Sequence, residues 1–275
     1  MPLTNRALRL RSVQVKAVAD LPSAAVEIIC HPEKFEFKSS GSAFSVRNPN
    51  PFPVQVALES GAGDDEILTA ARVTNWQEFR DLFAAEVISP TEQVVVGSQV
   101  VLFTDLRGST AMYSKIGDAP AYALVRDHFK ILHDVVAANH GGVVKTIGDA
   151  VMAVFGNLTE ALAAVRAMHE QLGKMNASQK IRLQLKSALH VGPCLAVNAN
   201  DKLDFFGSVV NLAARLVGSC AGDELVVADE VFRRPETQDF LREIRQTAVA
   251  GQEQFTGFPE PVRIWRIPMP AGRAG

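Results

Sequence analysis

The sequence predicts an α+β protein in which most of the chain forms a ferredoxin-like domain, an antiparallel sheet with helices on one face. The first observation behind this prediction is an order of strand, helix, strand, strand, helix and strand that begins near residue 99. The second is a series of short period-two runs before residue 61, which predicts a smaller β-rich domain. A chain of 275 residues suits two domains, so we predict a β-rich module at residues 1–90 and the ferredoxin-like domain at residues 91–275.

The N-terminal module contains alternating apolar and polar runs between Leu8 and Ser60, which predict short antiparallel strands separated by turns. Apolar side chains then recur at helical spacing in residues 67–83, so one or two helices are expected to close the module. The polar, turn-rich segment around Pro90 is the expected boundary. Residues 1–90 carry no recognisable ligand motif, and we expect them to serve in regulation or assembly.

The second module begins with the apolar run at residues 99–105, which predicts a buried strand that ends at an acid. After a loop, residues 120–139 fit a long amphipathic helix with a proline in its first turn and two glycines beyond its end. Residues 143–155 predict two strands joined by a tight turn at Gly148-Asp149, because this pair tolerates positive φ angles. The remaining expected elements are a helix at 158–175, strands at 182–191 and 194–198, a helix at 208–217, and strands at 224–228 and 261–267.

The composition excludes several classes of protein. The 28 basic and 30 acidic residues give a net charge of −2, so no chain-wide field would attract nucleic acid or anionic lipid. No run approaches the roughly 20 apolar residues that a membrane-spanning helix needs, and the start lacks the apolar block of a secretory signal, so we expect a cytoplasmic protein. The three cysteines lie too far apart for a zinc site or a disulfide framework.

Two acids are expected to meet at one edge of the sheet. Asp105 ends the first strand of the second module, and Asp149 lies at the tip of a hairpin that can pair beside it. Two carboxylates about 4 Å apart repel by roughly 4 kcal/mol at an effective dielectric constant near 20, so such a pair raises a pKa or binds cations. Hard oxygen ligands beside a phosphate site favour Mg²⁺. Taken singly, each acid is also compatible with a solvated turn.

Two further groups accompany this pair. Gly108, Ser109 and Thr110 follow the first strand in a short turn whose amide and hydroxyl groups can cradle phosphate oxygens, although the P-loop pattern is absent. Asn211 and Arg215 are four residues apart and so project from one face of a helix. By itself, a turn of this composition is most often structural, and a surface arginine most often pairs with an acid.

Three motifs together resemble the catalytic domain of class III nucleotidyl cyclases over residues 97–267, namely FTDLRGST, VKTIGDAVMAVF and DFFGSVVNLAAR. The resemblance implies a ferredoxin-like cyclase catalytic domain with two Mg²⁺ or Mn²⁺ ions per active site. It also implies metal ligation by Asp105, Asp149 and the Leu106 carbonyl, triphosphate contacts by Thr110 and Lys186, base recognition by Lys145 and Asp204, ribose orientation by Asn211, and transition-state stabilisation by Arg215.

The two base-reading positions favour adenine. Adenine presents N6 as a donor and N1 as an acceptor, which Asp204 and Lys145 match, whereas guanine O6 would face the carboxylate as acceptor against acceptor. We therefore expect an adenylate cyclase that converts ATP to 3′,5′-cyclic AMP and pyrophosphate for signal transduction. The alternatives are a catalytically weak or inactive cyclase-like module that binds nucleotide or dimerises, and a guanylate cyclase.

The resemblance also implies a homodimer, because members of this family assemble their active sites across a dimer interface. Asp105 and Asp149 of one chain would then face Asp204, Asn211 and Arg215 of its partner. All five residues occur in this one sequence, which suits a symmetric dimer with two equivalent sites. A monomer is expected to be inactive.

One position departs from the family pattern. Relatives commonly carry a lysine that contacts the triphosphate just before the closing strand, and this chain has Thr256 followed by Gly257. A charge-assisted phosphate contact contributes about 1.5–3 kcal/mol, so weaker ATP binding is expected. Lys186 or arginines near the carboxyl end would offset part of the loss.

Overall fold

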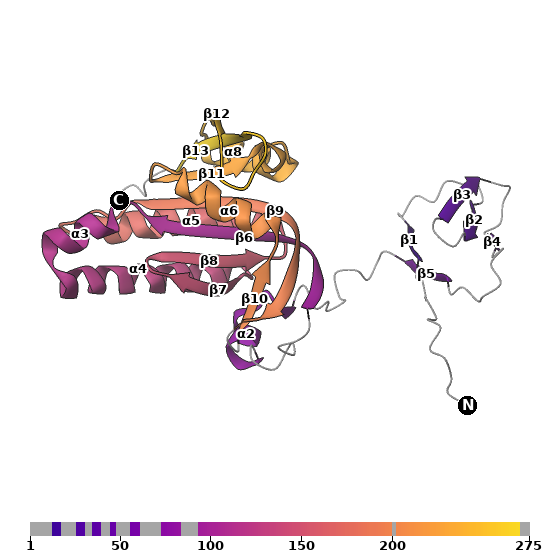
Figure 1. Cartoon of the computed structure of the whole chain (residues 1–275), viewed down its shortest axis with the longest axis horizontal. Helices are drawn as coiled ribbons and strands as arrows, with labels where there is room; N and C mark the ends of the chain where they lie inside the picture. Colours follow the sequence, from indigo (N-terminus) through magenta and orange to yellow (C-terminus); the bar gives the residue numbers. More distant parts are fainter. Residues whose placement is uncertain are drawn as a thin grey trace. The chain divides into compact units, whose positions relative to one another are not determined.

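The computed structural model divides the chain into two compact units, Met1–Leu68 and Thr69–Gly275 (Figure 1). It describes residues 73–83, 93–199 and 202–269 of the second unit, and the backbone of five strands in the first unit. Each unit has its own strand pairing, so the two are considered separately.

Two small sheets make up the described part of the first unit. β1 (Val13–Ala17) pairs in parallel with β5 (Val56–Ser60), and β2 (Val26–Cys30) pairs antiparallel with β3 (Phe35–Ser39) and in parallel with β4 (Ser45–Arg47). The prediction of short strands is confirmed, but among these pairs only β2 and β3 are antiparallel. The parallel partners are not consecutive in the chain, so the intervening strands provide the crossover that a parallel pair needs.

An eight-stranded sheet is the frame of the described part of the second unit. Its strands lie in the order β12-β13-β11-β9-β6-β8-β7, and β10 pairs with β9 outside this path. All neighbouring pairs are antiparallel except β9 with β11. The strands are β6 (Gln93–Leu106), β7 (Gly142–Ile147), β8 (Ala150–Phe155), β9 (Leu185–Asn198), β10 (Leu203–Phe206), β11 (Glu224–Ala228), β12 (Val249–Glu253) and β13 (Val262–Pro268).

The predicted ferredoxin-like order of elements is confirmed from β6 to β9. The two strands expected on either side of Gly192 and Pro193 are instead one continuous strand, β9, because its pairing with β6 runs through both residues. A bulge between Val96 and Ser98 on β6 absorbs the irregularity. The long β6–β9 pair is therefore the centre of the sheet.

The segment after β6, expected as a loop, contains a helix. α3 begins directly after Gly108, whose φ of 68° turns the chain out of the strand, and a second left-handed glycine, Gly117 with φ of 83°, separates α3 from α4. The helices of the second unit after β6 are α3 (Ser109–Ile116), α4 (Asp118–Ala138), α5 (Leu158–Ala177), α6 (Ser208–Gly218), α7 (Asp229–Phe232) and α8 (Pro235–Ile244).

Two apolar cores lie on opposite faces of this sheet. Successive residues of β6 divide between them, with Leu102 in the core under α4 and α5 and Phe103 in the core under α6. The expectation of helices on one face is therefore wrong for α6. The physical reason is that β6 is apolar at consecutive positions, so both faces of the sheet must be covered.

The boundary between the units also differs from the predicted one, falling after Leu68 and not near residue 90. Helix α2 (Gln77–Phe83), expected to close the β-rich module, belongs to the second unit. The side chains of Gln77 and Arg80 both bond to the backbone of β7, which fixes the helix there.

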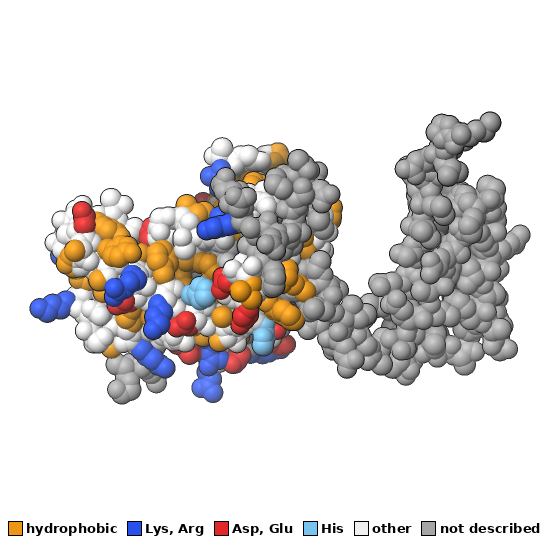
Figure 2. All heavy atoms as spheres, turned by 90° about the horizontal axis from the view of Figure 1, so that it is seen from below, with side chains coloured by type: hydrophobic (Ala, Val, Ile, Leu, Met, Phe, Trp, Pro, Cys, Tyr) orange, Lys and Arg blue, Asp and Glu red, His pale blue; other side chains and the backbone are white. Residues whose placement is uncertain are grey.

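Charged side chains of both signs are interspersed with hydrophobic ones on the face of the second unit shown in Figure 2. This mixture agrees with the small net charge of −2. Within the described residues, no helix combines the length and the apolar character needed to cross a bilayer.

Acidification is expected to destabilise the second unit through two buried histidines. Burial lowers the pKa of His128 on α4 and of His169 on α5 to about 4, from an ordinary value of 6.5. Between pH 6.5 and pH 4 these histidines are protonated in the unfolded chain but stay neutral in the folded state. Their contribution to the free energy of unfolding is therefore fully present above pH 6.5 and is lost as the pH falls toward 4. Each histidine would then cost about 2 kcal/mol at pH 5. Urea unfolding at pH 7.5 and pH 5 measures this loss.

The matched variant is His169→Gln, because its ring Nε2 lies 2.8 Å from Ser187 Oγ and an amide can make the same bond without titrating. It is expected to remove the roughly 2 kcal/mol that His169 contributes to the loss at pH 5. Equal slopes of stability against pH for the variant and the unmodified protein would contradict the assignment.

Candidate active site

The two acids singled out from the sequence lie at the same edge of the sheet. The pairing of β6 with β8 ends at Thr104 and Val151. Asp105 is the next residue of β6, and Asp149 lies two residues before Val151. The hairpin prediction is confirmed, because Ile147 and Ala150 are paired and the two residues between them form the turn. Gly148 has a φ of 64°, a left-handed conformation that glycine adopts without strain.

The two carboxylates have different surroundings. Asp105 Oδ2 lies 2.9 Å from the Nζ of Lys186, its direct neighbour across the β6–β9 pair. Asp149 Oδ2 is buried and accepts no hydrogen bond from the part of the chain that the structure describes. Leaving a buried carboxylate oxygen without a partner is costly, so this atom needs a cation or donor from outside the chain.

This donor set fits a hard divalent cation. Two carboxylates and a nearby backbone carbonyl are oxygen ligands of the kind that Mg²⁺ prefers, with further positions left to water and phosphate. Among the described residues, no cluster of three or more His, Cys, Asp and Glu side chains could hold a metal. The set therefore depends on Asp105 and Asp149, with the Leu106 carbonyl directly after Asp105.

The proposed phosphate turn leads into α3. Gly108 occupies the N-cap position without a side-chain cap, and Ser109 and Thr110 are the first two residues of the helix. The first amides of a helix have no intrahelical acceptor and favour anions. Because α3 starts four residues after Asp105, these amides lie close in the chain to the carboxylate at the edge of the sheet.

Lys145 and Asp204 form an ion pair, with 2.6 Å between Nζ and Oδ2. They come from β7 and β10, which are far apart in the sequence and adjacent in the fold. The Asp204 side chain is 10% exposed, and its other oxygen accepts a hydrogen bond from the Phe205 amide at 2.8 Å. The Lys145 side chain, 35% exposed, lies with its Nζ 5.7 Å from the centre of the Phe206 ring. The pair is thus preformed, and its lysine remains accessible.

Asn211 and Arg215 lie on the solvent face of α6, opposite the apolar residues that pack on the sheet. Both line a hollow of about 420 Å³ that also includes Thr256 and Gly257. The threonine that replaces the lysine of the family pattern is therefore beside this polar pair. Among the residues lining the hollow, Arg215 is the one with a cationic side chain.

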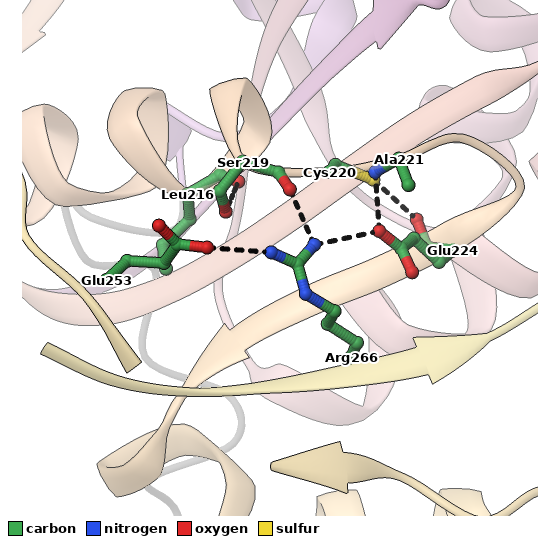
Figure 3. Close-up of polar contacts among 7 residues, drawn as sticks. All are labelled: Leu216, Ser219, Cys220, Ala221, Glu224, Glu253 and Arg266. Atoms are coloured by element: carbon green, nitrogen blue, oxygen red, sulfur yellow. Dashed lines mark hydrogen bonds and ion pairs between the residues drawn. The ribbon is translucent and has the colours of Figure 1, made fainter. Parts of the chain in front are cut away.

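Arg266 on β13 anchors the end of α6 (Figure 3). Its Nη1 donates to the carbonyl of Ser219, the C-cap of α6, and lies 3.0 Å from Glu224 Oε1, while Nη2 lies 2.9 Å from Glu253 Oε1. One planar guanidinium therefore joins the helix that carries Arg215 to β11 and β12. Arg266 has no local signal in the sequence, because its partners lie 13 to 47 residues away.

The structure thus brings the expected residues together in three groups. One group contains Asp105, Asp149 and Lys186 beside the α3 turn, a second contains Lys145 and Asp204, and a third contains Asn211 and Arg215. Among the described residues, no side-chain hydrogen bond or ion pair joins one group to another.

The family model of the adenylate and guanylate cyclase catalytic domain matches residues 92–258. The chain belongs to this family. The match covers all three groups of site residues, so residues 92–258 form a nucleotidyl cyclase catalytic domain. Such domains bind a nucleotide substrate, typically dimerise and generally use divalent metal ions.

Several known proteins resemble this cyclase domain. An uncharacterized protein of Mycobacterium tuberculosis is 34% identical over 165 residues, which are 60% of this chain and 40% of that protein. Adenylate cyclase 2 of Rhizobium meliloti is 26% identical over 59% of this chain and 49% of its own length. The crystal structure of the guanylyl cyclase Cya2 matches the fold with a TM-score of 0.55 and 20% identity, over 65% of this chain and 94% of that chain. The chain spans less than half the length of these two sequence relatives.

Proposed function

We propose that this protein is an adenylate cyclase, which converts ATP to 3′,5′-cyclic AMP and pyrophosphate at sites formed between two copies of the chain. The observation that supports this proposal most directly is the ion pair between Lys145 and Asp204. One member donates and the other accepts, which is the pattern that the pairing edge of adenine requires.

The contacts of Asp204 strengthen the preference for adenine. Its Oδ1 is occupied by the Phe205 amide and its Oδ2 by Lys145, so the carboxylate is held as an acceptor. Adenine N6 can donate to such a group and N1 can accept from Lys145. Guanine would place O6 against the same carboxylate, and an unmatched pair of acceptors in a largely buried site disfavours binding.

The remaining groups supply phosphate and metal contacts in this proposal. Asp105, Asp149 and the Leu106 carbonyl would hold two Mg²⁺ ions, which when bound neutralise phosphate charge and lower the pKa of the ribose 3′-hydroxyl. Lys186 balances the charge of Asp105 and can turn to a phosphate oxygen. The amides at Gly108, Ser109 and Thr110 receive the triphosphate.

Asn211 and Arg215, on the solvent face of α6, complete the site from the partner copy, which also supplies Asp204. Asn211 orients the ribose, and Arg215 meets the negative charge that develops around the transferring phosphoryl group. Their exposure and the adjoining hollow leave both side chains open to a bound nucleotide.

The test of this function is the product made by the purified protein with ATP or GTP in the presence of Mg²⁺ or Mn²⁺. We expect cyclic AMP and pyrophosphate in equal amounts, and a clear preference for ATP. Equal turnover of GTP would overturn the base assignment. Tight nucleotide binding without any product would favour a second candidate, a non-catalytic nucleotide-binding module, to which the neutral Thr256 beside Arg215 gives some support.

Exchanging the base-reading pair is expected to reverse the preference between ATP and GTP. The double variant Lys145→Glu/Asp204→Ser offers guanine N1–H an acceptor and O6 a hydroxyl donor. We expect kcat/KM for ATP to fall by a factor of about 100 or more, since a site that hydrogen-bonds its substrate strongly rejects a mismatched one. The matched control is Lys130→Glu/Asp134→Ser, which makes the same changes on the exposed face of α4. A variant that kept its ATP preference would contradict base reading by this pair.

A further inference from the structure

Arg80 on α2 lies directly behind the base-reading pair. Its side chain is buried, with 6% of the residue exposed, and its guanidinium donates to three backbone carbonyls. Nη1 donates to Thr74 at 3.0 Å, Nε to Val143 on β7 at 3.2 Å, and Nη2 to Leu203 on β10. One side chain therefore ties together the two strands that supply the pair.

Two of these carbonyls lie within two residues of the base-reading side chains in the chain. Val143 is two residues before Lys145 on the same strand, and Leu203 is the residue immediately before Asp204. A shift of either carbonyl would move the adjoining base-reading side chain. The Arg80 guanidinium also lies 5.5 Å from the centre of the Phe205 ring, on the other side of Asp204 in the chain.

Gln77, a second residue of α2, also binds β7. Gln77 Oε1 accepts a hydrogen bond from the Val143 amide at 2.7 Å, so Gln77 and Arg80 bind both the N–H and the C=O of one residue of β7. A side chain at Gly142 would come within 2.7 Å of the Arg80 side chain and of the Asn75 carbonyl. The segment thus packs on β7 without free space, which limits the movement of that strand.

We propose that Arg80, assisted by Gln77, is a positioning residue for purine recognition, which holds Lys145 and Asp204 at the separation that reads adenine. This inference rests on the proposed function, since it assigns a role in that same site. Both residues precede the region that matches the cyclase family, residues 92–258, so the chain recruits a helix from outside that region to set its base specificity.

The electrostatics are consistent with this role. Burial lowers the pKa of Arg80 to about 10, while the nearby charge of Asp204 opposes the shift, so the guanidinium stays protonated at neutral pH. Asp204 therefore has a buried cation on one side and the accessible Lys145 on the other. With Arg80 in place, Lys145 can turn to the base without leaving the carboxylate unbalanced.

The experiment compares Arg80→Gln and Arg80→Lys with the control Glu78→Gln, an exposed position on the same helix. For both Arg80 variants we expect KM for ATP to rise about tenfold, kcat to change by less than threefold, and the ratio of kcat/KM for ATP to that for GTP to fall about tenfold. The control is expected to match the unmodified protein. A merely structural role would lower kcat for both nucleotides in proportion and leave their ratio unchanged, which would overturn the proposal.

Amide hydrogen exchange gives a reading that does not depend on activity. In Arg80→Gln we expect exchange in β7 and β10 to become at least about tenfold faster while β11 and β13 keep their protection, and unchanged β7 and β10 would overturn the proposal. Gln77→Met is the second variant should Arg80→Gln fail to fold, with the same expectation at β7. If the unmodified protein makes no cyclic nucleotide, the proposed function fails, and exchange still decides whether Arg80 fixes the two strands.

Discussion

Replacing Asp149 by alanine is expected to abolish cyclic AMP formation, with kcat lowered about 1,000-fold or more. Asp149 offers a buried oxygen with no partner in the described chain, whereas Asp105 already has Lys186, so Asp149 is the carboxylate most available to a divalent ion. Loss of several kcal/mol of charge stabilisation at a metal site corresponds to a change of this size. The initial rate at saturating ATP and Mn²⁺ measures it.

The Asp149→Ala variant is expected to keep or gain stability although it loses activity. Removing a buried oxygen that lacks a partner relieves a desolvation cost, so we expect the metal-free Asp149→Ala protein to be as stable as the unmodified protein or more stable. The control is Asp134→Ala, which removes an exposed acid from α4 and is expected to change neither activity nor stability. An Asp149→Ala protein that kept a tenth of its activity would refute the metal site.

Mixing two inactive variants is expected to restore about a quarter of the activity. Arg215→Ala alone should lower kcat by a factor of about 100 to 1,000 and leave KM nearly unchanged, since it removes an interaction made in the transition state. If each site takes its acids from one chain and Arg215 from the other, a mixed dimer with Asp149→Ala has one intact site of two. Random exchange makes half of the dimers mixed, which gives roughly one quarter of the full activity.

The mixing experiment needs equal amounts of both variants and time for subunits to exchange, with each variant alone as the control. A mixture no more active than its components, while the proteins are shown to exchange subunits, would mean that each site is built from one chain. A monomeric active enzyme in light scattering would contradict the shared site in a second way.

The local pattern of the sequence was sufficient for two of the elements that carry site residues, the β7–β8 hairpin and α6, but not for α3, which was expected as a loop, or for β10, which was not expected. The β7–β8 hairpin follows from a Gly-Asp pair between two apolar runs, and α6 follows from the spacing that puts Asn211 and Arg215 on one face and apolar residues on the other. These signals are read over a few residues, so the context of the rest of the chain does not change them. The cyclase motifs depend on the same short segments, which is why the family was predicted correctly.

The tertiary structure decided where segments distant in the sequence meet. α2 has an apolar spacing that suits any core, and only its packing shows that Arg80 and Gln77 bind β7 of the second unit. The same holds for Arg266, whose three partners come from separate elements. Short-range periodicity specifies how a segment is folded and which of its faces is apolar. The contacts of a buried guanidinium depend on which backbone carbonyls lack a donor after the sheet has formed, and a one-dimensional pattern does not contain that information.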